Sequence, residues 1–72
     1  MELLNHIRQH RARLGLTQQD LAERVGVRRQ TILAIEKSKY VPSTLLALRI
    51  ARALAMPVRE LFELADDGEG TR

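Results

Sequence analysis

The stretch QQDLAERVGVRRQTILAIEK, residues 18–37, has the pattern of two short helices that cross at a tight turn. Gly26 separates the two halves and can adopt the positive φ that such a turn requires. The small side chain of Ala22 lets the helices approach closely. The inward apolar positions are Leu21, Val25, Val27, Ile32 and Ile35. This joint spacing favours a helix-turn-helix over a generic antiparallel helix pair.

Helices are also expected on both sides of this stretch. Residues 3–14 place apolar side chains on one helical face and end at Gly15. Thr17 and Asp20 have the spacing of a capping box for the next helix. Ser43 then caps a helix whose apolar residues cover more than half its circumference, which predicts a buried central helix. These residues are Leu45, Leu46, Leu48, Ile50, Ala51 and Leu54.

Pro57 begins a last short helix that carries Val58, Leu61, Phe62 and Leu64. The sequence therefore predicts an all-α domain of five helices over residues 1–65. Residues 66–72 contain no large apolar side chain and are expected to form an acidic, flexible C-terminal tail.

Composition limits the function. A chain of 72 residues without cysteine has room for one small domain, and it lacks disulfides and thiolate zinc sites. It has no apolar run long enough to span a membrane and no secretory signal, so we expect a cytoplasmic protein without a membrane partner. Residues 1–52 carry a net charge of +6 and residues 53–72 carry −3. On charge alone, this asymmetry fits a polyanion-binding face on the first part and an ordinary solvated surface equally well.

The helix after Gly26 has an outward face suited to reading DNA. Ile32 and Ile35 define its buried side, so arginine, glutamine and small apolar side chains point away. The forked donors and acceptors of arginine and glutamine match the major-groove edges of guanine and adenine, and apolar groups can contact thymine methyl groups. The predicted base contacts are Arg29, Gln30, Leu33 and Ala34.

Phosphate contacts are expected where two other segments flank this helix. Gln18 lies at a helix N-terminus, where free backbone N–H groups favour an anion. The second segment is the loop after the outward-facing helix, with Lys39 as the best candidate. The predicted phosphate contacts are Thr17, Gln18, Arg28, Lys37, Lys39, Tyr40 and Ser43.

Residues 15–43, GLTQQDLAERVGVRRQTILAIEKSKYVPS, resemble the Cro/CI-type (XRE family) helix-turn-helix domain, and the match continues from Ile7 to Leu64. The chain is most similar to the short stand-alone members of the cytolysin-repressor kind. The resemblance implies a five-helix, lambda-repressor-like fold and a transcriptional repressor or regulator. Such proteins bind a pseudo-palindromic double-stranded DNA operator as homodimers, with one helix of each subunit in the major groove.

The resemblance also implies roles for particular residues. Positions matching Arg29, Gln30 and Ala34 reach base edges in similar domains, and the glutamine matching Gln18 contacts the DNA backbone. A partly buried ion pair is expected between Arg11 and Glu36. The dimer interface is expected on the last helix, at Val58, Leu61, Phe62 and Leu64. Similar domains commonly have a helix-capping Ser or Thr at Arg28, and glycine at Ser38 and Ala55, so these helix ends are less ideal here.

No enzyme is indicated. The sequence has no catalytic constellation and no cofactor motif, and His6 and His10 lack a third metal ligand nearby, so we expect neither cofactor nor metal. Two alternatives stay open. The chain could be an antitoxin or restriction–modification controller of the same fold, or a protein-interaction module for which DNA is not the main ligand. A regulatory signal would have to come through a partner protein, protein concentration or competition at the operator.

Overall fold

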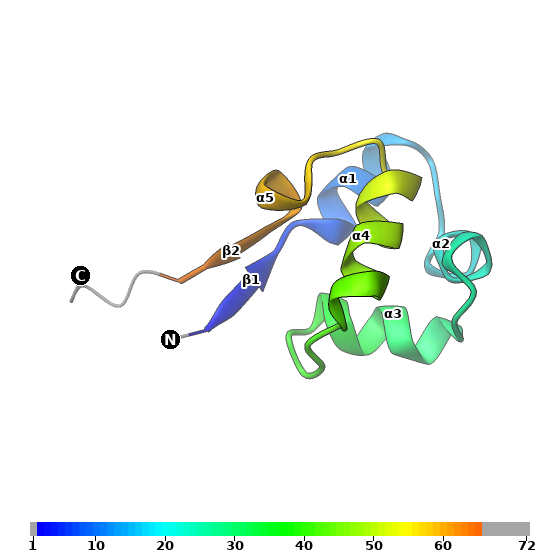
Figure 1. Ribbon diagram of the computed structural model, residues 1–72. Helices are drawn as coiled ribbons and strands as arrows, with labels where there is room; N and C mark the ends of the chain where they lie inside the picture. The colour runs from blue at the N-terminus through cyan, green and yellow to red at the C-terminus, as the bar shows by residue number, and fades with distance from the viewer. Residues whose placement is uncertain (1, 66–72) are drawn as a thin grey trace.

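The computed structural model describes residues 2–65 and contains five short helices and a two-stranded sheet (Figure 1). In chain order these are β1 (Leu3–Asn5), α1 (Ile7–Arg13), α2 (Gln18–Val25), α3 (Arg29–Glu36), α4 (Thr44–Ala53), α5 (Val58–Leu61) and β2 (Phe62–Leu64). The five helices confirm the predicted class, and the small sheet joins the two ends of the domain. No helix within residues 2–65 has the length and apolarity of a membrane span. The predicted acidic tail, 66–72, lies outside the described residues.

The starts of α2 and α4 follow from their capping residues. The Asp20 backbone N–H donates to the Thr17 hydroxyl at 3.0 Å, and the Thr17 backbone N–H donates to the Asp20 carboxylate at 2.9 Å. This reciprocal pair satisfies two N–H groups that a helix start otherwise leaves without a partner. At the start of α4, the Ser43 hydroxyl accepts a 3.1 Å hydrogen bond from the Leu46 backbone N–H. Both predicted caps are confirmed.

The turn between α2 and α3 has the geometry that the sequence predicts. Gly26 ends α2 in the left-handed region, with φ at 78°. The Val27 backbone N–H closes the turn by donating to the Ala22 carbonyl at 3.0 Å. Ala22 is completely buried, as the close crossing of two helices requires. Residues 18–36 therefore form a helix-turn-helix.

The core lies where α4 packs among the other helices (Figure 1). It consists of Ile7, Leu21, Ala22, Val25, Ile32, Ile35, Leu46, Ile50, Ala51, Leu54 and Leu61. The prediction that α4 is buried around more than half its circumference is wrong for two residues. Leu45 and Leu48 are 59% and 52% exposed, because the other helices cover only one side of α4. These leucines form an apolar stripe that the domain itself leaves uncovered.

The first helix begins later in the chain than the sequence predicts. Leu3–Asn5 is instead a strand that pairs antiparallel with β2, the segment predicted as the end of the last helix, with Asn5 opposite Phe62. The Asn5 side-chain oxygen accepts a 3.3 Å hydrogen bond from the Ile7 backbone N–H, and α1 begins at Ile7. The apolar spacing of residues 3–14 fits a helix locally. The strand forms because it pairs with β2, near the other end of the domain. The spacing of apolar residues within 3–14 carries no information about that pairing.

Two helices end in residues with unfavourable backbone angles. Ser38 follows α3 with φ at 60°, and Ala55 follows α4 with φ at 55°. These are the two positions where similar domains commonly have glycine. The left-handed region brings the Cβ of any other residue close to the backbone, so both positions are strained.

Candidate nucleic-acid interface

The outward face of α3 carries the side chains that were predicted to contact bases. Ile32 and Ile35 are buried on the inner side, with 0% and 1% exposure. Arg29 and Gln30 are exposed in the first turn, and the two small apolar positions beyond them are half-buried. These half-buried residues are Leu33 and Ala34. The structure thus brings the four predicted residues together on one helix, with the long polar side chains outermost.

Arg28 is the N-cap residue of α3, and its side chain makes no capping hydrogen bond. Its backbone is extended, with φ at −80° and ψ at 152°, and the residue is exposed. A serine or threonine here would use its hydroxyl for the helix start. The guanidinium of exposed Arg28, which precedes Arg29 in the sequence, can instead bind an external anion.

The start of α2 contacts the end of α3 through the bond from Gln18 to Glu36, and the backbone N–H of Gln18 has no acceptor within the helix. Thr17 is exposed, and its hydroxyl oxygen already accepts the capping bond. That bond still lets the hydroxyl donate its own hydrogen. The Thr17 backbone N–H bonded to the carboxylate lowers the pKa of Asp20 below its ordinary value of 3.8. The cap is therefore fully ionised at neutral pH.

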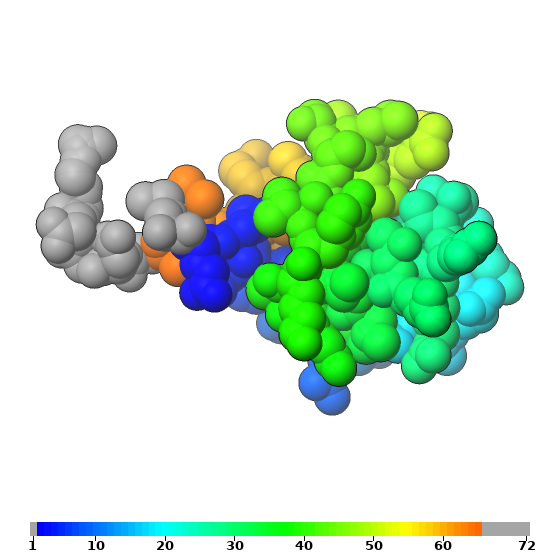
Figure 2. Space-filling model, turned by 90° about the horizontal axis from the view of Figure 1, so that it is seen from below, coloured from blue at the N-terminus to red at the C-terminus, as the bar shows by residue number. Residues whose placement is uncertain are grey.

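The segment after α3 supplies the remaining predicted phosphate contacts. Figure 2 shows this green segment beside α3 on the face seen from below. Lys37, Lys39 and Tyr40 are exposed, the last with 48% of its surface accessible. Ser43 is exposed as well, while its oxygen caps α4. Two lysines, a phenol and a hydroxyl therefore lie at the end of α3 opposite its arginines.

Arg11 and Glu36 form the ion pair that the resemblance implies. Arg11 Nε donates to Glu36 Oε2 at 2.8 Å, and Arg11 Nη2 donates to Oε1 at 3.2 Å. The two side chains are only 14% and 6% exposed. Arg11 also donates through Nη1 to the Leu16 carbonyl at 2.9 Å. Glu36 is the only acidic residue of α3, so its pairing leaves the outward face of α3 without a free carboxylate.

The same carboxylate has a second partner that sequence analysis missed. Gln18 Nε2 donates to Glu36 Oε1 at 3.1 Å, which links α2 to the ion pair. A glutamine at a helix start gives no local signal of a contact with a residue one helix further on. The sequence predicts Gln18 as a phosphate contact and does not predict its bond to Glu36.

The residues predicted for a dimer interface do not share one environment. Leu61 is completely buried and belongs to the core of its own chain. Val58 and Leu64 are 37% and 64% exposed, and Phe62 is half-buried. Val58 and Phe62 line an apolar groove of about 260 Å³ together with Leu48 of α4.

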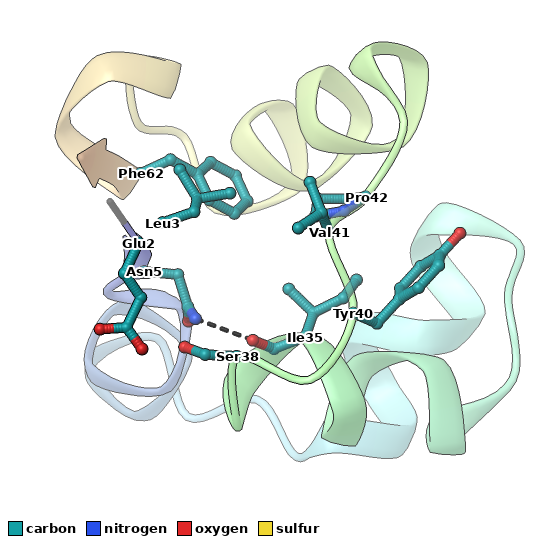
Figure 3. A pocket seen from close by; sticks show the side chains of 9 residues that line it. All are labelled: Glu2, Leu3, Asn5, Ile35, Ser38, Tyr40, Val41, Pro42 and Phe62. Carbon is teal, nitrogen blue, oxygen red and sulfur yellow. Dashed lines mark hydrogen bonds between the residues drawn. The ribbon is translucent and has the colours of Figure 1, made fainter. Parts of the chain in front are cut away.

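A second cavity, of about 230 Å³, adjoins this groove (Figure 3). Leu3 and Phe62 line one side, and Val41 and Pro42 line the other. Leu3, Pro42 and Phe62 line both cavities. An apolar surface therefore runs from the sheet to α4. Sequence analysis missed its contributions from β1 and the α3–α4 loop, since the strand pairing that creates it was not predicted.

The comparisons with known proteins agree with this geometry. The sequence profile of the family described as Helix-turn-helix matches residues 7–61. An uncharacterized HTH-type transcriptional regulator of Methanothermobacter thermautotrophicus is 60% identical over 63 residues, which cover 86% of this chain and 91% of that protein. An uncharacterized HTH-type transcriptional regulator of Bacillus subtilis is 49% identical over 63 residues, which cover 88% of this chain and 96% of that protein.

Solved structures agree as well. The restriction–modification controller protein C.AhdI from Aeromonas hydrophila is 31% identical and superposes with a TM-score of 0.71, covering 75% of this chain and 82% of the controller. The clp gene regulator ClgR from Corynebacterium glutamicum is 29% identical, with a TM-score of 0.70 over 72% of this chain and 55% of the regulator. The chain belongs to the Cro/CI-type (XRE) helix-turn-helix family of transcriptional regulators.

Proposed function

We propose that this protein is a sequence-specific, double-stranded DNA-binding transcriptional regulator that acts as a repressor in the cytoplasm. The observation that carries the proposal is the outward face of α3, where exposed Arg29 and Gln30 stand on a helix whose single carboxylate is already paired. A helix with this face fits the major groove, and an unpaired carboxylate there would repel the phosphates.

Base recognition is assigned to the outward face of α3. Arg29 would donate two hydrogen bonds to guanine O6 and N7, and Gln30 would pair with adenine N6 and N7. The half-buried Leu33 and Ala34 present apolar surface of the kind that contacts thymine methyl groups. Specificity would therefore reside in four residues within two turns of one helix.

Phosphate contacts are assigned to the two segments that flank α3. Thr17 and Gln18 would bind one stretch of DNA backbone through the start of α2. Lys37, Lys39, Tyr40 and Ser43 would bind another, and Arg28 would add a contact beside the bases. Contacts of this kind fix the position of α3 without reading the sequence.

We infer that the active form is a homodimer, joined through the apolar surface at the sheet end of the domain. Exposed Leu48 and Val58 line one apolar groove with Leu3, and exposed Leu64 is the strand partner of Leu3. Contiguous exposed apolar surface on a small domain is typical of an interface. In Figure 1 this end lies opposite α2, so a twofold axis there would place the two α3 helices on either side of it. The operator would then be pseudo-palindromic, with half-site centres about 34 Å apart.

A second role within the same class is that of a restriction–modification controller. The likeness to the controller protein C.AhdI, at 31% identity over 75% of this chain, favours it. Such a controller would use the same face of α3 on its own operator. The basic outward face speaks against a module that binds only proteins, because that role would not require arginine beside glutamine there.

The function is tested by selecting bound sequences from a pool of random duplexes. We expect an inverted-repeat motif, bound with a stoichiometry of two chains per duplex. Failure to enrich any motif, with weak binding that disappears as salt rises, would mean that the basic face is only an electrostatic patch. A single, non-repeated motif bound by one chain would contradict the homodimer but not the DNA-binding function.

A further inference from the structure

One carboxylate joins three helices next to the proposed DNA-binding face. Glu36, the last residue of α3, accepts hydrogen bonds from Arg11 of α1 at 2.8 and 3.2 Å and from Gln18 of α2 at 3.1 Å. Its side chain is 6% exposed. Arg11 holds both carboxylate oxygens, so Glu36 cannot rotate away without breaking the ion pair.

The bond to Glu36 fixes the Gln18 side chain but uses only part of it. A glutamine amide group carries two N–H donors in one plane, and only one of them is directed at Glu36. Gln18 is the first residue of α2, where backbone N–H groups have no acceptor within the helix. The second side-chain N–H and the backbone N–H of Gln18 are therefore available to an external acceptor, whereas the Asp20 backbone N–H is already bonded to the Thr17 hydroxyl.

We propose that Glu36 is a positioning residue for DNA binding, which holds the Gln18 amide so that its second N–H, with the backbone N–H of Gln18, binds one DNA phosphate. This inference rests on the proposed function. The buried ion pair would then contribute to DNA recognition as well as to the stability of the fold. Arg11 neutralises Glu36, so the carboxylate orients the donor without repelling the phosphate.

The physical benefit is pre-organisation. A free glutamine side chain has many rotamers, and fixing it at the moment of binding costs conformational entropy. In this protein the cost is met during folding, since the bond to Glu36 exists without DNA. The neighbouring Gln19 makes a useful contrast. Its amide donates at 2.9 Å to Glu23 on α2 itself, an exposed contact that involves no other helix.

The test is a double-mutant cycle on the selected operator. Gln18→Met removes the amide at similar length. Glu36→Asp keeps the charge opposite Arg11 but is one methylene shorter, so its carboxylate cannot serve both partners. We expect each single variant to bind roughly tenfold more weakly, as the loss of a hydrogen bond to a charged group predicts. The double variant should bind no more weakly than either. Gln19→Met is the matched control and should bind like the wild type.

The phosphate itself is identified with duplexes that carry one neutral methylphosphonate at a time. One position should weaken wild-type binding roughly tenfold and weaken Gln18→Met by a smaller factor, because only the backbone N–H still contacts that phosphate in the variant. Multiplicative losses in the double variant would overturn the positioning role. So would wild-type affinity of Gln18→Met on an operator that the wild type still binds, whereas a wild type that binds no operator contradicts the proposed function instead.

A second measurement needs no substitution and so does not depend on the folding of Glu36→Asp. In NMR spectra of the wild type, the two Gln18 side-chain amide protons should be shifted apart before DNA is added. On adding operator, the proton that is not bonded to Glu36 should move most. Two protons at the positions of an exposed glutamine, unmoved by operator, would overturn the proposal.

Discussion

The side chain of Asn5 donates a 2.8 Å hydrogen bond to the backbone carbonyl of Ile35, so the first strand is joined directly to the last turn of α3 (Figure 3). The same side chain accepts from the Ile7 backbone N–H. One residue thus connects the sheet end of the domain, where we place the dimer contact, with the helix that we place in the groove. The orientation of α3 depends on the terminal sheet as well as on the core.

Replacing Asn5 by Asp should destabilise the domain by about 1–3 kcal/mol, because the carboxylate can still accept from Ile7 but cannot donate to the Ile35 carbonyl. Urea unfolding measures the change. Gln9→Glu, a substitution of the same kind at an exposed position of α1, is the control and should have little effect. Equal stability of Asn5→Asp and the wild type would mean that this bond does not hold the sheet to α3.

Removing one partner of the buried ion pair should be costly. Glu36→Ala leaves Arg11 without its carboxylate at 14% exposure and should lower the free energy of unfolding by about 3–5 kcal/mol. The double variant Arg11→Met/Glu36→Leu should recover much of this loss, since no unpaired charge remains. A loss below about 1 kcal/mol in the single variant would show that water screens the pair despite its burial.

Ala55→Gly should stabilise the domain by up to about 1 kcal/mol. Ala55 has φ at 55°, and relief of that strain exceeds the extra chain entropy of glycine. Ala47→Gly, within α4, is the matched control and should destabilise by about 1 kcal/mol. Thermal unfolding of both variants measures the two changes in stability. Destabilisation by both substitutions would contradict the strain at Ala55.

Stability should depend on pH through Asp20. Its pKa in the folded chain lies below the ordinary 3.8, because the Thr17 backbone N–H bonds to the charged carboxylate. The ionised carboxylate therefore stabilises the fold above about pH 4, and this contribution is lost as pH falls through the lower, folded-state pKa.

The wild type should exceed Asp20→Asn in stability at pH 6, and the gap should close below the ordinary pKa of 3.8. Urea unfolding over a pH series measures it. Glu23→Gln removes one carboxylate from the same helix without touching the cap, and it controls for net charge. A gap that does not change with pH would rule out the carboxylate of Asp20 as its source.

Local chemistry predicts much of this fold. The caps at Thr17 and Ser43, the turn at Gly26 and the buried face of α3 all depend on residues within one or two helical turns. What escaped prediction is long-range. The pairing of Leu3 with Leu64 and the bond from Gln18 to Glu36 join residues far apart in the sequence. Local periodicity reports on the face of a helix, but it cannot report which distant segment covers that face.

The central claim, that Arg29 reads a base in the major groove, is tested most directly by measuring binding to the selected operator and to duplexes with one base pair changed. Lys39→Ala should weaken binding to all duplexes alike and reduce the salt slope by about 1. Arg52→Ala is the control for lost charge, since Arg52 lies in the last turn of α4 and is not among the residues assigned to DNA contacts.

For the wild type, changing the guanine at one half-site position should cost about 1–3 kcal/mol, and Arg29→Ala should bind the original and changed duplexes equally at that position only. If Arg29→Ala discriminates between the two as strongly as the wild type at every position, α3 does not read DNA through Arg29, and the account is contradicted.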